Sequence, residues 1–156
     1  NYTMKKFYSA LFISLISVLT LSACSDNDDG KEDEIQGKGA KYKVVFNQSG
    51  DHKSYSKILV IAANGSPLYD DIKQERVAKT AFNEGDMTED MFSISTEKKA
   101  LQFQVVASVL DLNDAPNASM TWEVIIYKDD KEIDRRKLNF EDGHTTTSHD
   151  LNLYFD

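Results

Sequence analysis

The sequence has one cysteine, two prolines and no apolar run long enough to form a membrane-spanning helix. The cysteine is Cys24, so the chain beyond it can contain neither a disulfide framework nor a thiolate metal site. The apolar run from Phe7 to Leu21 has 15 residues, whereas a spanning helix needs about 20. No internal repeat is present. Stability must therefore come from a hydrophobic core alone.

Positive charge is also scarce. The chain has 18 basic and 26 acidic residues, which gives a net charge of −8. Removal of an N-terminal segment that contains Lys5 and Lys6 leaves 16 basic residues and a net charge of −10. Such a field repels nucleic acid and anionic membrane surfaces, so we expect no nucleic-acid partner.

The N-terminal segment has the pattern of a signal peptide. Lys5 and Lys6 precede the apolar run, and small residues follow it. The stretch from Leu21 to Cys24 reads Leu-Ser-Ala-Cys and resembles a bacterial lipoprotein lipobox at all four positions. The resemblance implies cleavage before Cys24, a diacylglycerol thioether on its sulfur and a membrane anchor made of lipid. The alternative is an ordinary secretory signal followed by an unmodified cysteine.

The residues after Cys24 predict a flexible acidic tether that extends to Ala40. Its acidic residues are Asp26, Asp28, Asp29, Glu32, Asp33 and Glu34. An acidic cluster at this place resembles the export signal of Bacteroidota surface lipoproteins, which implies a cell-surface protein of the outer membrane. A spacer that faces the periplasm is the alternative. We thus expect a signal peptide (1–23), a lipidated cysteine with its tether (24–40) and a β-domain (41–156).

The β-domain is predicted from apolar residues that alternate with polar ones. The segment 101–109 alternates in this way, as does 120–126. Predicted strands are 41–48, 55–63, 76–82, 91–96, 100–110, 120–128, 132–140 and 149–155. This spacing favours an all-β fold, an immunoglobulin-like antiparallel β-sandwich of seven or eight strands. The layout of lipobox, tether and small β-domain resembles uncharacterised Bacteroidota surface lipoproteins with sandwich folds.

Two strands allow finer predictions. Residues 58–63 are apolar at every position, which is typical of a central strand. Trp122 alternates with Met120 and Val124 on the apolar side of its strand, so we expect it in the core and not stacked on a sugar.

Residues that could support catalysis are sparse. Ser148, His149 and Asp150 are consecutive in a predicted strand, so their side chains alternate between faces and cannot form one relay. Zinc is disfavoured because the β-domain has no cysteine and only three histidines. We therefore expect no enzyme activity, no cofactor and no metal needed for folding.

Calcium is the metal that the sequence excludes least. Asp111, Asn113 and Asp114 follow a long strand and carry oxygen ligands. They could meet the acidic loop 84–90 if both loops lie at one end of the sandwich. A solvated acidic loop is the alternative.

Three tyrosines are candidates for ligand binding on the surface. Tyr69 lies in a predicted loop, while Tyr127 and Tyr154 occupy the polar side of their strands. The function expected from these features is a lipid-anchored cell-envelope protein that acts as a non-catalytic binding or interaction module, with a protein or glycan as ligand. The alternatives are a structural or adhesive surface subunit and a hydrolase.

Overall fold

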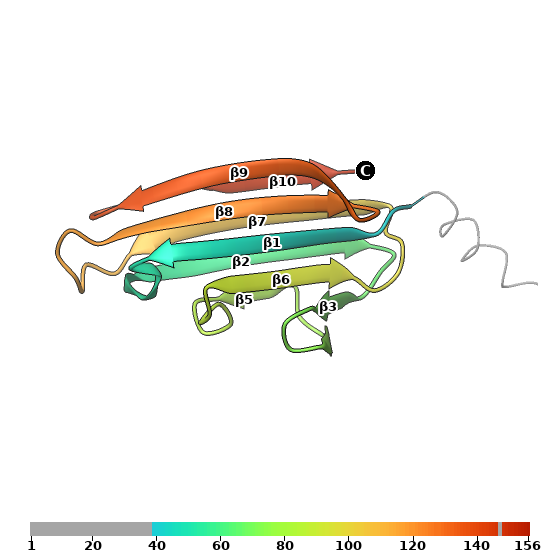
Figure 1. Cartoon of the computed structure of the whole chain (residues 1–156), viewed down its shortest axis with the longest axis horizontal. Coiled ribbons are helices and arrows are strands. Elements are labelled where there is room, and N and C mark those ends of the chain that lie inside the picture. Colours follow the sequence, from blue (N-terminus) through green and yellow to red (C-terminus); the bar gives the residue numbers. More distant parts are fainter. Residues whose placement is uncertain (1–38, 147) are drawn as a thin grey trace, which may run out of the picture.

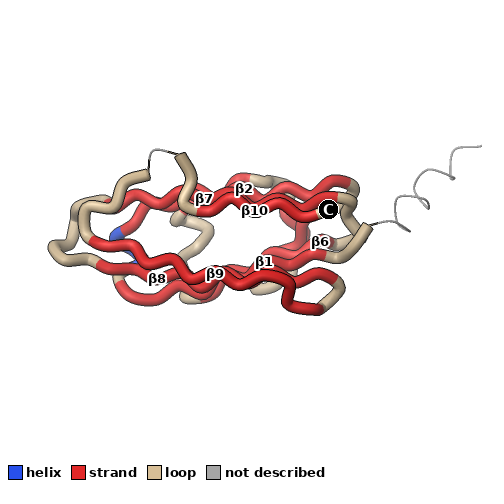
Figure 2. The backbone as a smooth tube through the Cα atoms, turned by 90° about the horizontal axis from the view of Figure 1, so that it is seen from above, coloured by secondary structure: helices blue, strands red, loops and turns tan. Residues whose placement is uncertain are grey.

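The computed structural model describes residues 39–146 and 148–156, in which two antiparallel sheets lie face to face (Figures 1 and 2). The predicted signal peptide, Cys24 and the tether up to residue 38 lie outside the described residues. Within the described part, the helical structure is a single 3-10 turn, η1 (His52–Ser54), and no helix there is long and apolar enough to cross a membrane.

The larger sheet has six strands and the smaller sheet has four. The larger contains, in spatial order, β4 (Glu75–Val77), β3 (Leu68–Asp70), β6 (Met91–Thr96), β1 (Tyr42–Gly50), β8 (Ser119–Lys128) and β9 (Lys131–Glu141). The smaller contains β10 (Leu151–Phe155), β7 (Gln102–Asp111), β2 (Tyr55–Asn64) and β5 (Ala81–Asn83). The predicted all-β antiparallel sandwich is confirmed.

The structure has ten strands among the described residues, whereas the sequence predicted seven or eight. The difference lies in three-residue strands, which are too short to show an alternating pattern. β3 was not predicted, and the predicted strand 76–82 is divided between the two sheets: β4 pairs with β3, and β5 pairs with β2. The chain changes sheets between them, where the N–H of Ile61 donates to the carbonyl of Thr80.

The core fills the space between the sheets. Trp122 is fully buried, as predicted, and its ring contacts the edges of Phe46 and Phe140 at centroid distances of 5.2 and 5.5 Å. Its indole N–H donates to Oε1 of Gln48 at 3.3 Å, so its polar atom is also satisfied. Aromatic rings from β1, β8 and β9 therefore pack into one cluster between the two sheets.

The prediction that residues 58–63 form a central strand is confirmed, because β2 lies between β7 and β5. Its two apolar faces differ in environment. Leu59 and Ile61 point into the core, while Ile58 and Val60 point outward and are exposed. An apolar outer face on this strand has no role in the core of the domain.

Candidate functional site

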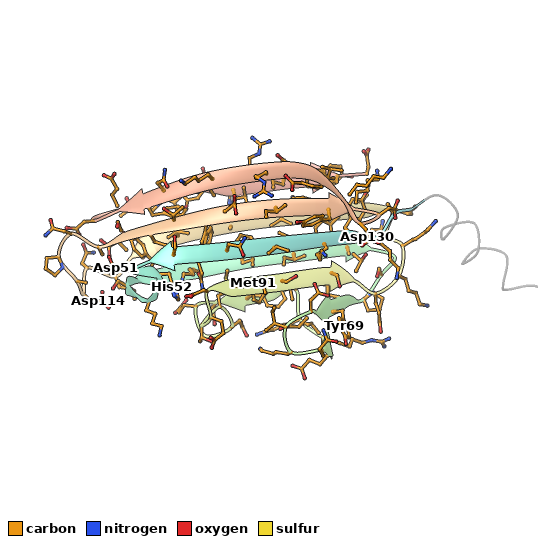
Figure 3. The ribbon with its side chains drawn as sticks, viewed as in Figure 1. Asp51, His52, Tyr69, Met91, Asp114 and Asp130 are labelled. Atoms are coloured by element: carbon orange, nitrogen blue, oxygen red, sulfur yellow. The ribbon has the colours of Figure 1, made fainter. Side chains whose placement is uncertain are left out.

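Four connections meet at the end of the sandwich far from the point where the chain enters it. They are the β1–β2 connection with η1, the β5–β6 loop (84–90), the β7–β8 loop (112–118) and the β9–β10 loop (142–150). Figure 3 shows Asp51, His52 and Asp114 at this end. We call it the carboxylate end, because acidic residues occur in every one of these connections.

Hydrogen bonds between backbone groups hold two of these connections together. The N–H of Asp51 donates to Ser119 O at 2.7 Å, and the N–H of Leu112 donates to Ser54 O at 3.0 Å. Gly50 makes this approach possible: it has a φ of +79°, and a β-carbon there would collide with the Ser119 carbonyl. The β1–β2 and β7–β8 connections are thus tied to each other.

Asp111, the last residue of β7, organises the loops around it. Its side chain is buried, with 2% of the residue exposed. The N–H of Gly143 donates to Oδ2 at 2.6 Å, and the N–H of Asn113 donates to Oδ1 at 2.9 Å. These hydrogen bonds, Gly143 first, hold the pKa of the Asp111 carboxyl below its usual value. Asp111 is therefore an ionised, buried carboxylate at neutral pH.

Asp142 brings a second carboxylate to the same place. Its side chain lies near enough to Asp111 to influence the pKa of the Asp111 carboxyl. Its Oδ2 also accepts the N–H of Asn117 at 2.9 Å. Two ionised carboxylates that lie near each other repel, and a cation between them would remove that repulsion. The pair joins the β7–β8 loop to the β9–β10 loop.

Further negative charge surrounds the pair. The hydroxyl of the buried Tyr55 donates to Ala118 O at 2.9 Å. Burial raises the Tyr55 pKa, and the nearby charges of Asp111, Asp142, Asp51 and Glu141 raise it further. The set has the oxygen-rich, anionic character that suits a hard cation such as Ca²⁺. Nevertheless, no group of three or more His, Cys, Asp or Glu side chains within the described ranges is already arranged to hold a metal. A cation here would need backbone carbonyls, amide oxygens or water as well.

The three residues proposed from sequence as calcium ligands lie at this end. Asn113 has a left-handed φ of 55° and donates its side-chain amide to Asp111 O, while Asp114 lies at the exposed tip of the loop. Asp142 and Asp51 were not among the residues predicted from the sequence. Asp142 was visible only as part of an Asp-Gly turn, and nothing in the sequence places it beside Asp111.

The acidic loop 84–90 reaches the same end but contributes differently. Glu84 accepts the N–H of Lys57 and the hydroxyl of Ser56, and Asp86 is paired with Lys79. Asp90 contacts Nε2 of His52 at 3.2 Å. These carboxylates are therefore engaged by neighbours on β2, η1 and the approach to β5.

The tyrosine candidates do not form one site. Tyr69 and Tyr127 lie on the same row of the larger sheet's outer face, with Ser95 and Lys43 between them. The Nζ of Lys43 is 4.7 Å from the centroid of the Tyr127 ring. Tyr154 is on β10, in the other sheet, and is exposed. A shallow groove of about 250 Å³ lies beside Tyr127, lined also by Lys41, Asp71, Ser95 and Asp130.

The segment Ser148-His149-Asp150 does not contain a relay within the described residues. Oδ1 of Asp150 lies 2.9 Å from Nε2 of His144, and Oδ2 of Asp150 accepts the N–H of Val109 at 2.7 Å. His149 is exposed. Asp150 thus fixes the β9–β10 loop against β7.

A family model described as "PLAT/LH2 and C2-like Ca2+-binding lipoprotein" matches residues 2–154. The chain belongs to this family. The match extends over the N-terminal segment, and membership of a lipoprotein family points to a membrane-anchored envelope protein. No curated protein matches the chain.

Solved structures agree with this assignment. The chain is similar to a protein from Parabacteroides distasonis, solved by NMR in its calcium-bound form, with 36% identity and a TM-score of 0.72 over 85% of this chain and 100% of that one. A DUF4425 family protein from Bacteroides ovatus shares the fold, with 24% identity and a TM-score of 0.58 over 75% of this chain and 93% of that one. A DUF4425 domain of unknown function from Bacteroides vulgatus has 25% identity and a TM-score of 0.56 over 76% of this chain and 93% of that one. Nothing in these names points to catalysis.

Proposed function

We propose that this protein is a calcium-binding, lipid-anchored module of the cell envelope, and that calcium binds at the carboxylate end between Asp111 and Asp142. The observation that carries the proposal is the convergence of two loops on acidic side chains: the buried Asp111 accepts the N–H of Gly143, and the neighbouring Asp142 accepts the N–H of Asn117. A cation here would neutralise the negative charge that these carboxylates bring together. The name of the family and the calcium-bound state of the Parabacteroides distasonis protein support the choice of calcium. The proposal departs from the metal-free domain expected from the sequence.

Asp111 and Asp142 would supply the charge of the site. Calcium takes six to eight oxygen ligands, so other groups must complete the coordination sphere. Asn113 and Asp114, on the β7–β8 loop, are the next candidates, and Asp51 and Glu141 add attraction from nearby. In this arrangement the ion would fasten the β7–β8 loop to the β9–β10 loop.

Calcium binding of this kind stabilises the folded domain, because the unfolded chain does not hold the two carboxylates together. A ligand present at 100 times its Kd contributes about 2.7 kcal/mol. We therefore expect the midpoint of thermal unfolding to be several degrees higher in millimolar calcium than in EDTA.

The test compares two matched Asp→Asn variants. Asp142→Asn removes one carboxylate of the pair and keeps an oxygen that can accept the Asn117 N–H. The control, Asp129→Asn, changes an aspartate in the β8–β9 hairpin at the opposite end, where Oδ1 accepts the N–H of Lys41. The calcium-dependent shift should vanish in Asp142→Asn and persist in Asp129→Asn. An equal shift in both variants, or none in the parent protein, would refute the site.

The wider role we propose is that of a non-catalytic binding module with a protein or glycan ligand. The groove beside Tyr127 supports this role, since it offers an aromatic ring together with Lys43, Asp71 and Ser95. An adhesive subunit that adds strands at β9 is less favoured, because outward charges such as Arg135 and Lys137 oppose pairing along that edge. A hydrolase would need a nucleophile beside a free base, and Asp150 is already paired with His144.

A further inference from the structure

The outer face of the smaller sheet carries no charged residue on its described strands. It consists of the fourteen outward positions of β2, β7, β5 and β10, which we call the uncharged face. They are Ser56, Ile58, Val60, Ala62, Asn64, Ala81, Asn83, Gln102, Gln104, Val106, Ser108, Leu110, Asn152 and Tyr154. Because 28% of the chain is charged, a whole sheet face without charge is unexpected on a surface that faces only water.

The middle of the uncharged face is aliphatic and its surroundings are amides and hydroxyls. Val60 lies between Val106 and Ala81 in the register, and Ile58 lies between Ser108 and Asn83. Ile58 is 61% exposed, and Val60 is 37% exposed. Leu110 and Tyr154, towards the margins, are 46% and 53% exposed. An apolar centre with a polar rim is the usual anatomy of a protein interface.

The outer face of the larger sheet differs sharply. Lys43, Glu123, Arg135 and Lys137 all point outward there, and Arg135 pairs with Glu123 at 2.6 Å. Absence of charge is thus a property of one face only. Figure 2 shows the two sheets as separate layers, with β7, β2 and β10 in the layer that carries the uncharged face.

We infer that the uncharged face packs against the same face of a second copy of this chain. Each Asn, Gln and Ser side chain carries both donors and acceptors, so a two-fold axis can bring such groups against their own copies with hydrogen bonds satisfied. No charge from these strands would meet its like across this interface, and the carboxylate of Glu84, which accepts the Ser56 hydroxyl, lies at the margin of the face. The net charge of −8 disfavours self-association through an acidic surface such as the carboxylate end.

The available area fits a weak dimer. β2 and β7 each have 10 residues, and β5 and β10 are shorter. At about 3.3 Å per residue and 4.8 Å between strands, the face covers about 440 Å² per copy, or about 900 Å² in a dimer. That is near the lower limit for a specific interface. Anchoring in a membrane would favour the dimer, because it confines the copies to a plane and raises their effective concentration.

Other occupants fit the uncharged face less well. It has no basic residue to attract an anionic lipid surface, and the amides of Gln102, Gln104 and Asn152 would lose hydrogen bonds in a lipid interior. Its only aromatic side chain is Tyr154, which is a poor platform for stacking several sugars.

The test is photo-crosslinking of the full chain in membranes. Benzoylphenylalanine replaces Ser108 at the centre of the uncharged face, or Val45 on the outer face of the larger sheet as the control. Two differently tagged copies are co-expressed and irradiated. We expect a product of twice the monomer mass that carries both tags from the Ser108 position, and none from the Val45 position.

A second change shows whether the face itself is responsible. Val106→Lys places like charges across the two-fold axis and should reduce the crosslinked dimer by about tenfold. Val45→Lys, a matched substitution on the other face, should leave it unchanged. Ile58→Lys replaces Val106→Lys if the latter lowers the melting temperature. The inference would be overturned if the Ser108 probe gave no dimer, or if it crosslinked to another protein, a lipid, a glycan or its own chain. It would also be overturned if the lysine variants formed as much crosslinked dimer as the parent protein.

Discussion

Lys57 provides a quantitative test of the packing around the carboxylate end. Although charged, it points inward from β2 and is only 1% exposed. Its Nζ donates to the carbonyl of His52, which connects β2 to η1. Burial lowers the Lys57 pKa from 10.5 to about 8, against a smaller opposing effect of Glu84. The unfolded chain, where the amine is in water, keeps a pKa near 10.4.

The sign of the pH dependence follows from these values. Between the two pKa values the unfolded chain binds more protons at Lys57 than the folded chain, so the free energy of unfolding increases with pH. The gain is full above the unfolded pKa and is lost as the pH falls through 8. For the shift cited, it amounts to about 2 kcal/mol between about pH 7.5 and pH 9.5. Above about pH 10, ionisation of Tyr55 in the unfolded chain acts in the opposite direction, because its folded pKa is raised.

The assay is urea unfolding in EDTA at several pH values in this window. Lys57→Met keeps an unbranched side chain of similar length and removes the titrating group, so its stability should vary much less with pH. Lys53→Met, at an exposed lysine of η1, is the control and should follow the parent protein. The free energy of unfolding of the parent protein could instead stay flat or fall between about pH 7.5 and 9.5, with the same pH profile in Lys57→Met. That result would contradict a lowered pKa of Lys57 in the folded protein.

Two further predictions concern the core and the anchor. Trp122→Ala should lower the free energy of unfolding by about 3–5 kcal/mol, because it removes a large, fully buried side chain; a melting temperature that does not change would contradict its place in the core. Cys24→Ser should release the protein from membranes while leaving its β-sheet circular dichroism intact, since the anchor is expected on Cys24 and the sandwich is built from residues beyond it. A Cys24→Ser protein that still sediments with membranes after a salt wash would speak against lipidation at this residue.

The fold could be predicted because long strands have a clear period. β6 has the predicted bounds, and β7, β8 and β9 lie within two residues of theirs. β3, β4 and β5 have three residues each, and their positions are decided by pairing with distant partners such as β6 and β2. Periodicity also could not reveal that Lys57 points inward, since its burial depends on the η1 carbonyl that accepts its hydrogen bond.

The candidate site was predictable only in part, for a similar reason. Asp111, Asn113 and Asp114 are close in sequence, so their common loop was evident. Asp142 is 31 residues away from Asp111, and the two meet because β9 returns along β8 to the same end of the sandwich. The uncharged face was hidden as well. The apolar outer positions of β2 predicted a central strand, and only the structure shows that no described element covers them.

The central claim is that calcium binds between the β7–β8 and β9–β10 loops, and residue-resolved NMR during a calcium titration tests it most directly. We expect the largest amide shifts at Asn113 and Gly143, whose N–H groups donate to the Asp111 carboxylate, and at Asn117, whose N–H donates to Asp142. The amide of Lys41, which donates to Asp129 at the far end, should stay unchanged. Shifts concentrated around Asp129, or an absence of shifts at millimolar calcium, would contradict the account.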